Sequence, residues 1–76
     1  MTVSSFQKII AENIRGFRLK NGFSQEKLAI LAEISLEHVG LIERGQTNPS
    51  VAVIFKISEA LGIEPSKLLT PDAYKK

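Results

Sequence analysis

Apolar residues recur at three- and four-residue spacing near the start of the chain, which is the spacing of one face of a helix. The residues on this face are Phe6, Ile9, Ile10, Ile14 and Phe17. Ser4 or Ser5 can begin this helix. Asn21 and Gly22 are expected to end it, because both residue types tolerate the left-handed backbone that closes a helix.

Two short helices are predicted next, on either side of a tight turn. Ser24 can cap the first one, which is expected to end near Ala32. Ser35 can cap the second one, which runs to Arg44 and is closed by Gly45. Their inward-facing residues are expected to be Leu28, Ala29, Leu31, Val39 and Ile42. We expect the two helices to cross closely at a steep angle, which suits the small alanine in this set.

The rest of the chain predicts a fourth helix and a short fifth one. Ser50 can cap the fourth helix, and Gly62 is expected to end it. Its buried side is expected to contain Ile54, Ile57 and Leu61. Proline is favoured in the first turn of a helix, so Pro65 predicts a fifth helix over Glu64–Leu69.

The chain is long enough for one domain with one modest core. Its 76 residues bury only about 60% of the surface that the unfolded chain exposes. No strand-like alternation interrupts the helical pattern. We expect residues 1–70 to form one compact all-α domain with five helices, and residues 71–76 to form a short, frayed C-terminal tail.

Composition narrows the possible kinds of site. The chain has no cysteine and one histidine, so we expect no disulfide, no metal site and no cofactor. Met1–Phe6 lacks the pattern of a signal peptide, and no apolar run approaches the roughly 18 residues of a membrane span. A cytoplasmic protein without a membrane partner is expected. No paired carboxylates, nucleophile–base set or glycine-rich phosphate loop indicates an enzyme.

Charge gives only weak evidence for a nucleic-acid partner. Ten Lys and Arg residues against eight Asp and Glu residues leave a net charge of +2. The distribution is more informative, because the first helix carries Lys8, Arg15, Arg18 and Lys20 against Glu12 alone. We expect this helix to supply part of an electropositive face.

Short motifs occur in a particular order between Ile14 and Leu69. They are Arg15 and Arg18, Gly22–Gln25, Leu28–Ala29, Ile34–Ser35, Ile42–Gly45, Asn48–Ser50 and Ala60–Ile63. In order and spacing these motifs resemble those of the helix-turn-helix family. This family includes phage Cro/C1-type repressors, restriction-modification controller proteins and related XRE-like bacterial regulators. The resemblance implies a lambda-repressor-like fold and a transcriptional regulator that binds double-stranded DNA. The third helix would then lie in the major groove.

The resemblance also implies which residues face the bases. These are Leu36, Glu37, Gly40 and Leu41. Leucine can contact a thymine methyl group, glutamate can accept from cytosine N4, and glycine lets the helix backbone come close. Family members more often carry Gln, Arg, Thr or Ser at such positions. We therefore expect DNA shape to supply part of the specificity.

Phosphate contacts are implied at the start of the second helix and after the third. The candidate residues are Gln25, His38, Arg44, Gln46, Thr47 and Asn48. His38 has an equally good alternative, which is to cover the solvent side of the third helix. Glu43 would be repelled by phosphates, and the resemblance instead pairs it with Arg18 as a structural ion pair.

One residue of the predicted turn departs from the family pattern. Family members often have glycine at the first turn position, where this chain has Glu33. A left-handed glutamate would cost on the order of 1 kcal/mol.

The fourth helix begins with five consecutive apolar residues, Val51–Phe55, which extend beyond one buried stripe. Either the core wraps around this helix or part of it meets a second subunit. The candidate interface residues are Val53, Phe55, Leu68 and Leu69. A homodimer would place two reading helices on half-sites about 34 Å apart.

A different class of function remains open at this stage. Leu36 and Leu41 are apolar residues on the reading face that the resemblance implies, as in a surface that binds protein. The alternative function is a protein-interaction module, such as an antitoxin-like partner protein.

Overall fold

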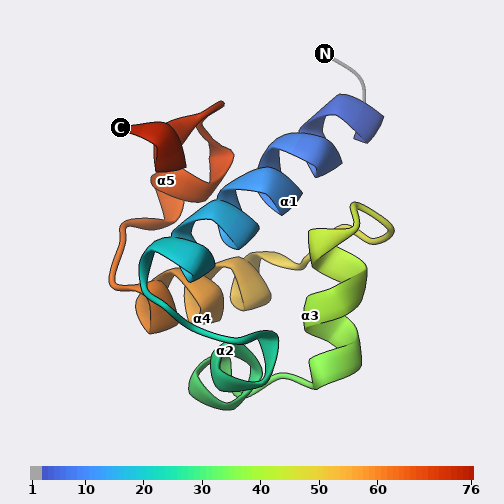
Figure 1. The fold of residues 1–76 in the computed structure, drawn as a ribbon. Helices are drawn as coiled ribbons and strands as arrows, with labels where there is room; N and C mark the ends of the chain where they lie inside the picture. The colour runs from blue at the N-terminus through green and yellow to red at the C-terminus, as the bar shows by residue number, and fades with distance from the viewer. Residues whose placement is uncertain (1–2) are drawn as a thin grey trace.

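The computed structural model describes residues 3–76, with side chains from residue 5 onward, and this range is all-helical (Figure 1). The elements are α1 (Val3–Lys20), α2 (Gln25–Ala32), α3 (Leu36–Glu43), α4 (Val51–Leu61), α5 (Pro65–Leu69) and a final 3₁₀ turn, η1 (Ala73–Lys75). The predicted all-α fold with five α-helices is confirmed for the described residues. α1 begins slightly before the expected start at Ser4 or Ser5.

Serine side chains cap the N-termini of three helices, as the sequence predicts. The hydroxyl oxygens of Ser24, Ser35 and Ser50 accept hydrogen bonds from backbone amides three residues later. Each cap satisfies an amide that the helix leaves unpaired and is worth about 1 kcal/mol. Gly22 and Gly62 close α1 and α4 in the left-handed conformation.

The core lies where α1 crosses the other helices, and α1 contacts α3, α4, α5 and η1 (Figure 1). Each α-helix contributes a fully buried side chain to it. These side chains are Ile14, Leu28, Ile42, Ile57 and Leu68. α2 packs against both α3 and α4, so the turn between α2 and α3 is supported from the core side.

Two predicted orientations are wrong. Leu31, which was expected to face inward, is 43% exposed, and the buried residue at this end of α2 is Ala32. Leu68, which was expected at a subunit interface, is 0% exposed and belongs to the core. Both residues lie in short helices, where several adjacent apolar residues do not define a single stripe.

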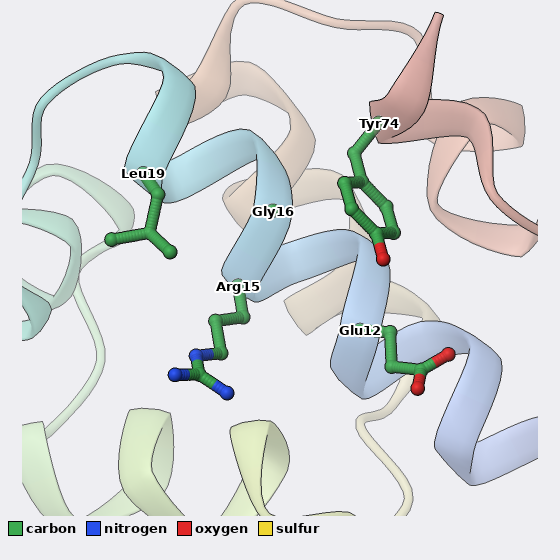
Figure 2. Close-up of a pocket in the computed structure, with 5 residues that line it drawn as sticks. All are labelled: Glu12, Arg15, Gly16, Leu19 and Tyr74. Carbon is green, nitrogen blue, oxygen red and sulfur yellow. The ribbon is translucent and has the colours of Figure 1, made fainter.

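The expectation of a frayed tail at residues 71–76 is also wrong. Ala73 is buried in the core, and the Tyr74 ring lies against α1 beside Gly16 (Figure 2). Lys20 Nζ donates to the carbonyl of Lys76 at 3.0 Å. The pKa of Lys75 is raised, mainly by its hydrogen bond to the Asp72 carboxylate. The C-terminal turn therefore covers one side of α1.

A buried asparagine joins α1 to the segment before this turn. The side chain of Asn13 is fully buried, and its Nδ2 donates to the carbonyls of Leu68 at 3.0 Å and Thr70 at 2.7 Å. These carbonyls lie at the end of α5, where no further helical turn can satisfy them. Asn13 thus acts as a C-terminal cap supplied by another helix.

Gly16→Ala tests how tightly the final turn packs. A methyl group at position 16 would overlap the Tyr74 side chain, so we expect a loss of about 1–3 kcal/mol in the free energy of unfolding. In a Tyr74→Gly background the same substitution should instead add about 1 kcal/mol, because alanine favours a helix over glycine. Urea unfolding of the four proteins measures both effects. Equal effects in the two backgrounds would contradict this packing.

Candidate nucleic-acid interface

The turn between α2 and α3 is held in a conformation that few side chains adopt. Glu33 has φ 57° and ψ 44°, so the turn holds a glutamate in the left-handed conformation. Backbone hydrogen bonds from Glu33 N to the Ile30 carbonyl and from Ile34 N to the Ala29 carbonyl close the turn. These bonds offset part of the strain of about 1 kcal/mol. The direction in which α3 leaves α2 is thereby determined by a very short segment.

α3 has one side in the core and one side toward solvent. Val39 and Ile42 are buried, so they define the inner side. Leu36 is 47% exposed, Glu37 is exposed and Leu41 is half-buried. The outer side of α3 is therefore accessible at three of the four expected base-reading positions. The fourth, Gly40, is buried.

A buried ion pair attaches the end of α3 to α1. Arg18 Nε donates to Glu43 Oε2 at 2.7 Å, and Arg18 Nη2 donates to Glu43 Oε1 at 3.0 Å. Their side chains are only 10% and 4% exposed. Arg18 Nη1 also donates to the Phe23 carbonyl at 2.9 Å, so each guanidinium nitrogen has a partner. Two parallel hydrogen bonds between Arg and a carboxylate restrict the relative orientation of the two helices.

Gln25, the first residue of α2, also forms a hydrogen bond with the Glu43 carboxylate. Its Nε2 donates to Glu43 Oε1 at 3.1 Å. The sequence predicted a phosphate contact for Gln25 but gave no sign of this contact, because the two residues approach only in the folded domain. The side chain is half-buried, which leaves part of the amide open to solvent. One carboxylate therefore holds together α1, the first residue of α2 and the last residue of α3.

The other expected phosphate contacts surround the end of α3. Gln46 and Asn48 are exposed, and Thr47 is half-buried. These three residues follow Gly45, whose left-handed backbone turns the chain away from α3. His38 lies half-buried on α3 itself. These side chains therefore remain partly or fully open to a ligand.

Arg44 takes a conformation that the sequence did not predict. The side chain is exposed and turns back along α3, where its Nη1 lies 3.0 Å from the position that a Cβ on residue 40 would occupy. Its Nε donates to Gln46 Oε1 at 3.0 Å. The guanidinium group therefore lies over Gly40.

An apolar groove lies on a different part of the surface. It has a volume of about 360 Å³. The lining residues are Phe6, Ile10, Pro49, Val51, Ile54, Phe55, Pro65 and Leu69. Of the expected interface residues, Phe55 (57% exposed) and Leu69 line this groove, while Val53 is half-buried beside the core. The groove therefore brings together exposed apolar side chains from α1, α4 and α5.

Other kinds of site receive no support from the described residues. Residues 3–76 contain no group of three or more His, Cys, Asp or Glu side chains that could hold a metal ion. No helix in the same range is long and apolar enough to cross a membrane. The recess beside Tyr74 in Figure 2 measures about 230 Å³ and has Glu12 and Arg15 as its charged lining residues.

Glu43→Gln tests the role of the buried pair. The variant leaves the Arg18 charge buried without its counter-charge, so we expect the free energy of unfolding to fall by about 3 kcal/mol. Glu59→Gln removes an equal charge from an exposed position of α4 and should change stability by less than about 0.5 kcal/mol. Urea unfolding compares the two variants. Equal stability of Glu43→Gln and the parent chain would show that the pair contributes nothing.

Sequence comparison relates the chain to known regulators. Residues 14–68 match the family model described as helix-turn-helix. Control protein C.BamHI of Bacillus amyloliquefaciens is 39% identical over 67 residues, which cover 87% of this chain and 83% of that protein. Control protein C.SmaI of Serratia marcescens is 33% identical over 69 residues, which cover 91% of this chain and 82% of that protein.

Solved structures share the fold. The restriction-modification controller protein C.AhdI from Aeromonas hydrophila has a TM-score of 0.80 at 40% identity, covering 82% of this chain and 94% of that one. The hypothetical transcription factor NHTF from Neisseria has a TM-score of 0.88 at 31% identity, covering 99% and 86%. Because the family model matches most of the chain and these relatives match over most of their length, the chain belongs to the helix-turn-helix family, as the resemblance predicted.

Proposed function

We propose that the protein is a DNA-binding transcriptional regulator, a repressor or a restriction-modification controller, that places α3 in the major groove. The observation that carries this proposal is the exposure of Leu36 and Glu37 on a helix that the core and the Glu43 ion pair hold in place. A helix needs an accessible side of this kind to reach base edges. The family relationship supports the same function. Such a regulator acts in the cytoplasm, beside the DNA that it binds.

The base contacts are assigned to the accessible side of α3. Leu36 and Leu41 would contact thymine methyl groups, and Glu37 would accept from cytosine N4. The resemblance assigns Gly40 a close approach of the helix to DNA, although the Arg44 guanidinium group lies over it in this structure. Phosphates would be bound by Gln25 on one side of α3 and by His38 and the residues after α3 on the other. The residues after α3 for which the resemblance implies this role are Arg44, Gln46, Thr47 and Asn48.

We propose that two copies bind a two-fold operator through the apolar groove. A short reading helix makes few base contacts, and pairing two such helices increases affinity through effective concentration. The groove offers Phe55 and Leu69 as exposed apolar residues that a second copy would cover. Val53, the third expected interface residue, packs against the core. Covering them would remove apolar surface from water, which favours association.

The DNA-binding proposal is tested by selecting duplexes from a random pool. We expect the parent chain to enrich a two-fold symmetric motif whose half-sites lie about one helical turn apart. Glu37→Gln should change the base preferred at one position of each half-site, since an amide can also donate a hydrogen bond. Glu59→Gln makes the same charge change on α4 and should leave the motif unaltered.

Two outcomes would contradict this assignment. Enrichment of no duplex at all would favour the alternative of a protein-interaction module, such as an antitoxin-like protein. Enrichment with an unchanged motif for Glu37→Gln would show that Glu37 is not a reading residue.

The dimer is tested with Phe55→Glu. A carboxylate in an apolar interface is costly to desolvate, so the dissociation constant of the dimer should rise by about tenfold or more. Ile30→Glu is the matched control, because Ile30 is also exposed but does not line the groove. Analytical ultracentrifugation over a concentration series measures the mass. A weakened dimer for Ile30→Glu together with an unchanged one for Phe55→Glu would place the interface elsewhere.

A further inference from the structure

Three observations on the Arg44 side chain bear on its role. Its guanidinium group lies over Gly40, one turn nearer to the N-terminus of α3 than its own backbone. The Nε of Arg44 donates a hydrogen bond to Gln46 Oε1. Within the described residues, Nη1 and Nη2 make no hydrogen bond. The Nη1 and Nη2 groups of Arg44 are therefore free to donate, while its Nε is held by Gln46.

Glycine at position 40 lets the Arg44 guanidinium group lie close against the helix. A Cβ there would stand 3.0 Å from Arg44 Nη1, which is closer than side-chain contacts normally are. Long side chains on helices point toward the N-terminus of the helix, so Arg44 reaches back by the ordinary route. The Arg44 guanidinium group therefore lies against the helix at Gly40, one of the expected base-reading positions.

The rest of the reading face lacks hydrogen-bond donors. Leu36 and Leu41 have apolar side chains, and an ionised Glu37 can only accept. Guanine presents two acceptors, O6 and N7, in the major groove, and the paired amino groups of arginine match them. Arg44, whose guanidinium group lies over Gly40, carries such a pair of donors.

We infer that Arg44 reads a guanine in each half-site, oriented by Gln46 and accommodated by Gly40, in place of the phosphate contact that the family resemblance implies. The free Nη1 and Nη2 groups would donate to O6 and N7 of one base. Gln46 acts as a positioning residue, because it holds Nε and thereby the plane of the guanidinium group. The inference rests on the proposed DNA-binding function and extends it to a specific residue.

A phosphate contact and a guanine contact respond differently to lysine. Lysine keeps the charge that a phosphate attracts but loses the planar fork that matches two acceptors. A phosphate-binding Arg44 would therefore tolerate Arg44→Lys with an unchanged motif. A guanine-reading Arg44 would not.

The experiment selects duplexes from the same random pool with the parent chain, Arg44→Lys, Gln46→Ala and Arg15→Lys. We expect the parent motif to contain a guanine that is preferred about tenfold or more over other bases. Arg44→Lys should lose most of this preference while other positions keep theirs, and Gln46→Ala should weaken it partly. Arg15→Lys, the same change at an exposed position of α1, should preserve the full motif. Thermal unfolding verifies that each variant is folded.

The outcomes separate this inference from the function on which it rests. If the parent chain enriches no duplex, the proposed function fails. If the parent enriches a motif and Arg44→Lys retains every base preference, or weakens binding equally for all sequences, the inference alone is overturned. A motif without guanine would overturn it as well.

Discussion

The placement of α3 depends on one buried carboxylate. Glu43 accepts two hydrogen bonds from Arg18 and one from Gln25, so a single side chain connects three helices. A buried charge without its partner is strongly unfavourable, and each member therefore requires the others to be in position. Hydrophobic contacts alone would allow α3 to rotate or slide slightly on the core. The directional hydrogen bonds restrict such movement at the end of α3, while Val39 and Ile42 anchor its middle.

Local chemistry accounts for the parts of the fold that the sequence predicted well. The serine caps and the closing glycines act on backbone groups a few residues away, so they can be recognised without knowing the tertiary structure. The left-handed backbone at Glu33 was suggested by the glycine that family members often have at this position, and not by a local signal of this sequence. The Arg18–Glu43 pairing came from the family resemblance rather than from such local signals.

The parts that were missed depend on contacts between distant segments. Asn13 caps carbonyls more than fifty residues away, and nothing around it in the sequence indicates this. Tyr74 and Ala73 pack because α1 offers Gly16 and an open side of the core. Leu68 and Leu69 are adjacent apolar residues, and only the packing of α5 decides which one is buried. The exposure of a site residue shows that a ligand can reach it, but the preferred base depends on geometry that side-chain type alone does not give.

The arrangement at Gly40 also bears on how base-reading roles are transferred between relatives. An alignment assigns a role to each position as though every side chain acted at the level of its own backbone. Here Gly40 has no side chain, and the guanidinium group of Arg44, one turn further along the chain, lies over it. On the inference above, the chemistry presented at position 40 is that of arginine, and its orientation depends on Gln46 in the following loop. The base preference of such a helix then depends on residues that contact one another as well as on each position alone. Substitutions at Gly40 and Arg44 should therefore be interpreted together.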